Sequence, residues 1–297
     1  MSTDNLVNRR KFGNMALLAV GAPALAKAPP RLELAVAVRA AERATGGRVG
    51  FAVDDTATGR RFSHRGRERF PMASTFKMLL VAAILERVDR GVESLERVIP
   101  VRAGDLLDVS PVSKAHVGGT ATVAELAEAT MIYSDNTAAN LLLPAVGGPA
   151  GLTAFLRRIG DPVTRLDRNE PTMSEARPGD PRDTSSPDAM LATWERLLLG
   201  NTLSPASRER LTGWLVANTT GDTRLRAGFP KEWRVGDKTG TGAAVTGTVN
   251  DVAIVWPDRI DTRPLLIASF INGGTAPAET LYRTHAELAR AVAAGIA

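Results

Sequence analysis

The chain has 297 residues, of which 44% are hydrophobic, so it can bury a core large enough for one large domain or two interlocked ones. It contains no cysteine, which excludes a disulfide framework, a thiolate nucleophile and a cysteine-based metal site. The net charge of +5 includes no extended basic run, so it indicates a solvated surface rather than a nucleic-acid partner.

Three histidines, His64, His116 and His285, lie far apart and form no metal-binding motif. We therefore expect no metal and no other cofactor. Any hydrolysis would then be carried out by side chains alone.

The first 26 residues are typical of an export signal. Arg9 and Arg10 precede an apolar run, Met15–Ala26, that is too short to span a bilayer and ends in the cleavage pattern Ala-Leu-Ala. We predict that residues 1–26 are a signal peptide and that the mature protein is periplasmic or secreted. The paired arginines resemble a twin-arginine signal, and an ordinary secretory signal is the alternative.

The mature chain begins with a predicted helix over 31–43, where apolar residues recur at helical spacing. Strands are expected at 48–53 and 60–63, joined by a turn at Thr58-Gly59. A long helix is then predicted over 74–90, because apolar residues recur along one face until Gly91 ends it.

From 122 to about 210 the pattern predicts one helix after another, with no strand between them. Strands return at 235–239, 248–257 and 264–271, and a final amphipathic helix covers 279–294.

We therefore predict an α/β (α+β) fold with an antiparallel sheet flanked by the terminal helices, a mostly helical inserted domain, and the active site between them. The expected boundaries are 27–66 and 222–297 for the α/β domain and 67–221 for the helical domain.

The first candidate motif is Ser74-x-x-Lys77 at the start of the long helix. Three residues of separation place both side chains on one face, where a lysine kept from water can act as a base toward the hydroxyl. The helix start also offers free backbone N–H groups to an oxyanion. Alone the motif is weak, since serine is a common N-cap and lysine an ordinary helix residue.

Two further motifs follow along the chain. Ser134-Asp135-Asn136 lies between two predicted helices, where Ser134 could relay a proton and Asn136 could donate an amide; a capped turn is the structural alternative. Lys238-Thr239-Gly240-Thr241 lies in a predicted strand, where a cation and hydroxyls suit a ligand carboxylate, although a lysine also protects sheet edges from aggregation.

Together, the three motifs form the set S-x-x-K, S-D-N, K-T-G of class A β-lactamases and penicillin-binding proteins. The chain resembles the class A serine β-lactamase family over nearly all of the mature sequence. The resemblance implies that Ser74 attacks the β-lactam carbonyl, which is polarised by the backbone N–H groups of Ser74 and Thr241. It also implies that Ser134 protonates the ring nitrogen. The acylation base is left open between Lys77 and Glu170 acting through a water.

The segment from Arg168 to Asp183 resembles the Ω-shaped loop of this family. The resemblance implies that Glu170 activates the deacylating water, that Arg168 and Asp183 hold the ends of the loop, and that the bond from Glu170 to Pro171 is cis, which proline allows. A charged surface loop is the alternative without the other motifs.

Three positions depart from the usual family pattern. Ser174 stands where an asparagine usually helps to hold the water, and Val109 stands where an aromatic side chain often stacks on the substrate. Gly247-Thr248 lacks the arginine that often binds the substrate carboxylate, and Arg224 resembles the arginine that other members use instead. We expect Lys238, Thr239, Gly240, Thr241 and Arg224 to hold that carboxylate.

The resemblance thus implies hydrolysis of penicillins, with cephalosporins as a second candidate class, and antibiotic resistance. We expect a monomer that binds a small β-lactam and neither nucleic acid nor membrane. A penicillin-binding D-Ala-D-Ala peptidase would lack the deacylating Glu170, and an exported binding protein would have a decayed site. A Ser-His-Asp esterase would need a G-x-S-x-G motif, which is absent.

Overall fold

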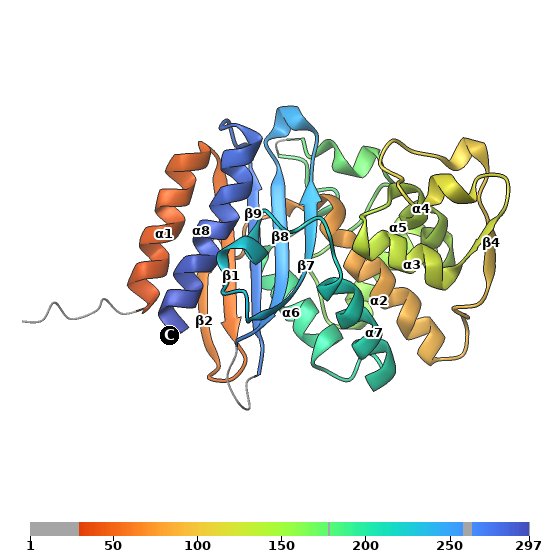
Figure 1. Ribbon diagram of the computed structural model, residues 1–297, viewed down its shortest axis with the longest axis horizontal. Coiled ribbons are helices and arrows are strands. Elements are labelled where there is room, and N and C mark those ends of the chain that lie inside the picture. Colours follow the sequence, from red (N-terminus) through yellow and green to blue (C-terminus); the bar gives the residue numbers. More distant parts are fainter. Residues whose placement is uncertain (1–29, 178, 258–262, 297) are drawn as a thin grey trace, which may run out of the picture.

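The computed structural model describes residues 30–177, 179–257 and 263–296. The predicted signal peptide, residues 1–26, lies outside these residues. Within them the chain forms an antiparallel sheet with two helices on one face and a helical body on the other (Figure 1). This arrangement confirms the predicted fold class.

The sheet has five antiparallel strands in the order β2-β1-β9-β8-β7. Their bounds are Arg48–Asp55 (β1), Arg60–His64 (β2), Arg234–Thr241 (β7), Val249–Trp256 (β8) and Leu265–Asn272 (β9). The three central strands are buried along almost their whole length, because both faces of the sheet are covered. The strand with the K-T-G motif, β7, lies at the edge, as its composition indicated.

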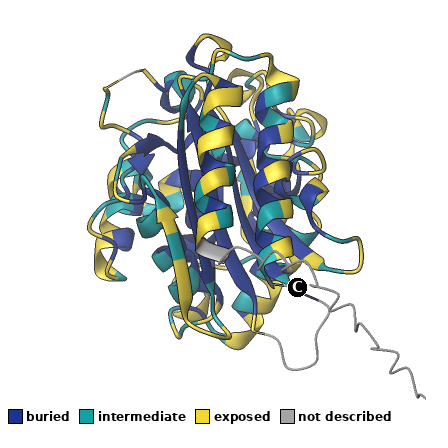
Figure 2. Cartoon of the chain, turned by 90° about the vertical axis from the view of Figure 1, so that its left-hand side faces the viewer, coloured by how far each residue is buried: buried dark blue, intermediate teal, exposed yellow. Residues whose placement is uncertain are grey.

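The terminal helices, α1 (Pro30–Thr45) and α8 (Ala278–Ile296), pack side by side on one face of the sheet. Figure 2 shows both helices with exposed outer stripes in front of the buried strands. Their inner faces enclose an apolar cluster with residues such as Val38, Phe51 and Ile267. This packing confirms that the two ends of the chain build one layer.

The other face carries the helical body, whose helices are α2 (Phe76–Asp89), α3 (Val123–Ile132), α4 (Asn136–Leu142), α5 (Gly148–Arg158), α6 (Pro187–Leu198) and α7 (Pro205–Val216). The described chain also contains short 3₁₀ helices, of which η6 and η7 adjoin strand β7 of the sheet: η1 (Ala73–Thr75), η2 (Ala103–Asp105), η3 (Ser113–His116), η4 (Leu143–Val146), η5 (Thr172–Glu175), η6 (Leu225–Gly228) and η7 (Ala244–Thr246). The first ten residues of α2 are all buried, including Lys77, so this helix forms the centre of the body.

Two short strand pairs lie outside the main sheet. They join β3 (Phe70–Pro71) to β6 (Thr184–Ser185) and β4 (Val98–Pro100) to β5 (Thr120–Thr122). The expectation of no strand between 122 and 210 is therefore wrong at β6. A strand of two residues carries no alternation pattern, and only its pairing with the distant β3 creates it.

Polar caps set several helix boundaries. Thr122 forms a capping box with Glu125 at the start of α3, and Ser186 and Ser204 accept hydrogen bonds from the first turns of α6 and α7. Among the described residues no single helix combines the length and apolar composition needed to cross a bilayer. One bent pair of helical segments, 136–146 with 148–158, reaches that length and composition only when the two are counted together.

His285 on α8 is fully buried, and its Nδ1 lies 2.7 Å from Ser269 Oγ. Burial, assisted by the charge of Arg224, lowers the pKa of His285 from 6.5 to about 3. Below about pH 6.5 the unfolded chain therefore binds a proton that the folded chain does not bind. Stability contributed by this residue is present at neutral pH and is lost as the pH falls.

We predict that lowering the pH from 7 to 5 removes about 2 kcal/mol of unfolding free energy through His285 alone. Urea unfolding of the wild type and of His285→Gln at both pH values measures this term, because glutamine keeps hydrogen-bonding capacity without titrating. The variant should lose less stability than the wild type by that amount. Equal losses in the two proteins would contradict the assignment.

Candidate active site

Ser74 lies in the η1 turn directly before α2, rather than in the first turn of the α-helix as expected from the sequence. The preceding residue, Ala73, has a φ of 44°, a left-handed conformation that costs a non-glycine residue roughly 1–3 kcal/mol. Hydrogen bonds to Met72 O from Asn250 Nδ2 (3.0 Å) and Thr75 Oγ1 (2.9 Å) hold this turn. The local strain is thus maintained by surrounding structure, and Ser74 remains half-buried at the surface of a cavity.

Lys77 is fully buried one turn further along α2. Its Nζ lies 2.5 Å from Asn136 Oδ1, 2.7 Å from Ser134 O and 3.3 Å from Ser134 Oγ. Burial lowers the pKa of Lys77, and the negative charges of Glu170 and Asp135 oppose this shift. The S-x-x-K and S-D-N motifs therefore meet at one ammonium group.

Ser134 connects the second motif to the third. Its Oγ accepts a hydrogen bond from Lys238 Nζ at 3.1 Å as well as the one from Lys77. The backbone of Ser134 is left-handed (φ 58°), which turns it into the site between α3 and α4. The next residue, Asp135, caps α4, and its carboxylate accepts from the backbone N–H groups of Val112, Ser113 and Ala138.

Lys238 is also fully buried, on the edge strand β7. Burial and, second to it, the nearby positive charge of Lys77 lower its pKa from 10.5 to about 7. The hydroxyl of the next residue, Thr239, lies 2.5 Å from Thr220 Oγ1. A cation and a hydroxyl group therefore lie side by side at this point of β7, where both could bind an anion.

Gly240 lets β7 approach the nucleophile turn. A Cβ at this position would lie 2.6 Å from Met72 O and 3.2 Å from Ser74 N. Any larger residue would push the strand away from Ser74. The glycine thus fixes the spacing between the backbone N–H of Ser74 and the end of β7.

Glu170 is buried and faces both Ser74 and Lys77. Its Oε1 lies 3.4 Å from Ser74 Oγ and 3.6 Å from Lys77 Nζ. Its Oε2 accepts a hydrogen bond of 2.9 Å from Ser174 Oγ. The sequence indicated Ser174 as a partner of a water, whereas in this structure it contacts the carboxylate directly.

Asn140 on α4 holds the backbone of Glu170 at two points. Its Nδ2 donates to Glu170 O (2.9 Å), and its Oδ1 accepts from Glu170 N (3.1 Å). The next peptide bond, to Pro171, is cis, as the resemblance implied. Sequence analysis missed Asn140, because an asparagine inside a predicted helix gives no signal of a contact 30 residues away.

Arg168 and Asp183 meet at the base of the loop, 2.6 Å apart between Nε and Oδ2. Asp183 Oδ1 also accepts from the backbone N–H groups of Asp167 (2.7 Å) and Arg168 (3.0 Å). In return, Asp167 Oδ2 accepts from the backbone N–H of Asp183. The expected closure of the loop is present.

Arg224 is 5% exposed, so it is a buried cation rather than one at the solvated surface. Its guanidinium donates to Gly240 O (3.0 Å), Asn250 O (2.7 Å) and Thr241 Oγ1 (2.7 Å), and it stacks 4.7 Å from the ring of Tyr282. Burial lowers its pKa, although an arginine stays protonated. The guanidinium is therefore held by hydrogen bonds against the C-terminal end of β7.

These groups surround one cavity of about 590 Å³, a size suited to a small ligand. Its lining includes Ser74, Ser134, Asn136, Glu170, Pro171, Ser174, Arg224 and Thr239 to Gly242. Val109 lies at its rim with 53% of its surface exposed. In the described part of the chain, no three acidic or histidine side chains gather as a metal site would require.

A model of the beta-lactamase enzyme family matches residues 33–296. Beta-lactamase L2 of Stenotrophomonas maltophilia is 47% identical over 251 residues, covering 84% of this chain and 82% of that protein. An ancestral (GNCA) class A β-lactamase structure is 57% identical with a TM-score of 0.85, covering 87% and 98% of the two chains. A β-lactamase from Xanthomonas campestris pv. campestris is 49% identical with a TM-score of 0.88, covering 91% and 99%.

The chain belongs to the class A β-lactamase family. It is a serine hydrolase that opens β-lactams and confers antibiotic resistance. This assignment decides against the peptidase, binding-protein and esterase alternatives left open by the motifs. The four sequence segments that carried the resemblance all reach the cavity of this class A enzyme.

We predict that Asp183→Ala costs about 3 kcal/mol of unfolding free energy, because it leaves the Arg168 guanidinium without its closest partner. Urea unfolding measures the loss. Glu287→Ala is the matched control, since Glu287 pairs with the exposed Arg283 on α8 and should cost less than about 1 kcal/mol. Similar losses in both variants would contradict a special role for the buried pair.

Proposed function

We propose that this β-lactamase acts through an acyl-enzyme on Ser74, which Glu170 then hydrolyses with an activated water. The observation that carries the proposal is the position of Glu170 Oε1, within 3.4 Å of Ser74 Oγ and 3.6 Å of Lys77 Nζ. One carboxylate can therefore exchange protons with the nucleophile and with a water beside it.

Substrate binding uses the cationic end of the cavity. Lys238, Thr239, Thr241 and Arg224 hold the β-lactam carboxylate through charge-assisted hydrogen bonds. The Oδ1 of Asn136 already accepts from Lys77, so its Nδ2 is the group left to donate to a substrate carbonyl. This set orients the ring without touching the bond that breaks.

The ring carbonyl is polarised by the backbone N–H groups of Ser74 and Thr241. The close approach of Gly240 to Ser74 N supports this pair, since it brings the two backbone segments to either side of one oxygen position. Ser74 Oγ bonds to the carbonyl carbon, and collapse of the tetrahedral intermediate breaks the ring C–N bond.

For acylation, we favour Glu170 as the group that receives the Ser74 proton, directly or through a water. Ser74 Oγ donates to Glu170, whereas Lys77 Nζ faces three acceptors on Ser134 and Asn136. Three acceptors fit an ammonium that keeps its three protons. Lys77 then acts as a fixed positive charge beside the developing oxyanion.

Ser134 is the proton donor to the ring nitrogen. Its hydroxyl lies between the ammonium groups of Lys77 and Lys238, at 3.3 and 3.1 Å, so it can donate its own proton and be supplied again from a lysine. Glu170 passes the Ser74 proton to Lys77 as Lys77 resupplies Ser134, so Lys77 remains an ammonium and Glu170 is again a carboxylate. Glu170 then removes a proton from a water that attacks the ester, and it returns this proton to Ser74 Oγ as the ester C–O bond breaks.

The remaining expectations are proposals of the same kind. We infer that penicillins are substrates and cephalosporins a second class, that the enzyme is an exported, periplasmic or secreted monomer, and that it binds neither nucleic acid nor membrane. The division into 27–66 with 222–297 and 67–221 is proposed as the domain organisation. It is supported by the two apolar clusters on opposite faces of the sheet.

We predict that Glu170→Gln acylates more slowly than the wild type and then accumulates acyl-enzyme, because the amide can take a proton neither from Ser74 nor from water. Steady-state penicillin hydrolysis should fall by roughly 10²–10⁴-fold. Mass spectrometry of the intact protein after mixing with penicillin should show one covalently added substrate. Rapid turnover by the variant would contradict a role for Glu170 in deacylation, and acylation at the wild-type rate would contradict its role as the acylation base.

We predict that Ser174→Ala lowers kcat by roughly 10-fold, since it removes a hydrogen bond to a charged group, which is worth about 1.5 kcal/mol or more. Steady-state kinetics with a penicillin measures the change. Thr172→Ala is the control, because that residue also lines the cavity but its hydroxyl donates to Asn169 O rather than to Glu170. An unchanged kcat in Ser174→Ala would show that Glu170 is held without it.

A further inference from the structure

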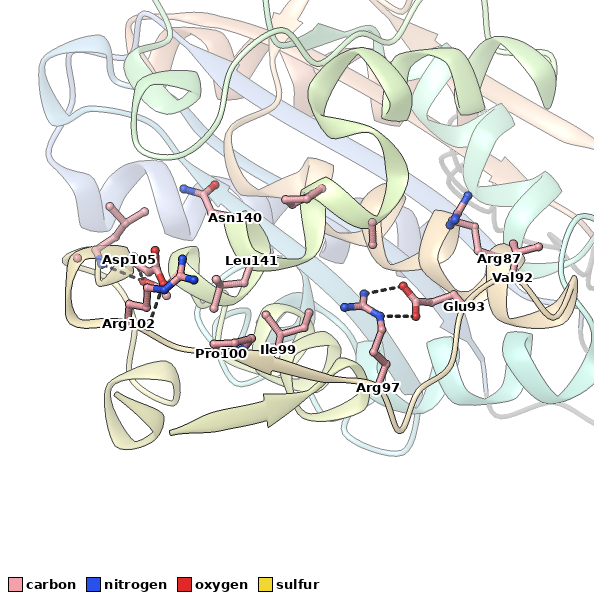
Figure 3. Close-up of a pocket in the computed structure, with 15 residues that line it drawn as sticks. Arg87, Val92, Glu93, Arg97, Ile99, Pro100, Arg102, Asp105, Asn140 and Leu141 are labelled. Carbon is pink, nitrogen blue, oxygen red and sulfur yellow. Dashed lines mark hydrogen bonds and ion pairs between the residues drawn. The ribbon is translucent and has the colours of Figure 1, made fainter. Parts of the chain in front are cut away.

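A second cavity, larger than the active site, lies on the far side of α4. It has a volume of about 940 Å³ and is formed by α2, the 92–107 segment, α4 and η4. Figure 3 shows its labelled side chains, with Arg87 and the pair of Arg97 and Glu93 at one end and Arg102 at the other. None of the motif residues that face the β-lactam lines this cavity.

The middle of the cavity is apolar. Ile99 and Pro100 lie opposite Leu141 in Figure 3, and Pro144 and Leu107 complete this surface. A flat hydrocarbon group would be removed from water between them, with a gain of about 25 cal/mol per Å² of buried apolar surface.

Two guanidinium groups of this cavity have no anionic partner at hydrogen-bonding distance among the described residues. Arg97 is bound by Glu93 through two hydrogen bonds of 2.8 and 2.7 Å, so its charge is compensated. Arg87 Nε is buried without a hydrogen-bond partner, and the side chain of Arg102 forms no ion pair with a described residue. Guanidinium groups in this state bind carboxylates with paired hydrogen bonds.

We propose that this cavity is a binding site for a small aromatic carboxylate, distinct from the active site. The ring lies against Ile99, Pro100 and Leu141, and the carboxylate pairs with Arg102 or Arg87. A neutral aromatic compound would lose the ion pair, and a bare inorganic anion would lose the apolar contact. Both features are needed for binding.

The location places an occupant one helix away from the catalytic carboxylate. Asn140 lines the cavity with its α4 neighbours and holds the backbone of Glu170 through two hydrogen bonds. On the loop side, Leu107 donates its backbone N–H to Thr137 Oγ1, and Asn136 N donates to Val109 O. The walls of the two cavities therefore share α4.

The test is a titration of ¹⁵N-labelled protein with naphthalene-2-carboxylate, followed by the backbone amide shifts. Shifts should concentrate at Leu107 and Leu141 and be much smaller at Thr239 and Gly240. At the same concentration, naphthalene-2-carboxamide and inorganic phosphate should not shift the amides of Leu107 and Leu141. This readout does not depend on β-lactam turnover, so it stands or fails apart from the proposed mechanism.

Variants give the second arm of the test. Arg102→Met should weaken binding roughly 2- to 5-fold, as removal of one partly exposed charge would, and adding Arg87→Met should weaken it again. Arg90→Met is the control, because Arg90 lies at the C-terminal end of α2, pairs with Glu86 and does not line the cavity. The proposal would be overturned if Arg102→Met and Arg90→Met weakened binding equally. It would also be overturned if the carboxamide bound as tightly as the carboxylate, or if the shifts were confined to Thr239 and Gly240.

Discussion

The active site depends on two lysine ammonium groups, Lys77 and Lys238, that are both fully buried and share one hydroxyl, that of Ser134. Removing such charges from water costs several kcal/mol each unless acceptors surround them. The acceptors come from distant segments: Asn136 from α4 and Glu170 from the loop. Because the charges must be compensated, the folded chain has to bring these segments together.

The sheet contributes the second of these two buried ammonium groups. Its edge strand β7 carries Lys238 into the interior, and Gly240 allows its backbone to lie against the turn that presents Ser74. Arg224 donates hydrogen bonds to the backbone carbonyl of Gly240 on β7 and to that of Asn250 on β8, which ties the end of β7 to β8. The positive charge and the strained nucleophile turn are thus parts of one packed unit.

The loop from Arg168 to Asp183 is anchored in the apolar core by Met173, and polar bonds hold the rest of it. The pair at its base closes it, and Asn140 fixes the backbone of Glu170 from α4. A carboxylate that must stay within a few tenths of an ångström of its partners needs such support. The same helix also forms a wall of the second cavity, so the fold uses α4 on two faces.

The sequence by itself determined the elements and the chemistry of the site. Periodicity located the terminal helices, the main strands and the buried helix after Ser74, and the three motifs with the Glu170 loop identified the reacting groups. Tertiary structure alone decided which groups touch: that β6 pairs with β3, that Ser74 lies in a 3₁₀ turn, that Ser174 binds Glu170 directly and that Asn140 holds it. The reason is physical, since periodicity reports which face of an element is buried, whereas contacts such as Asn140 with Glu170, 30 residues apart, and Ser134 with Lys238, 104 residues apart, follow from how those faces pack.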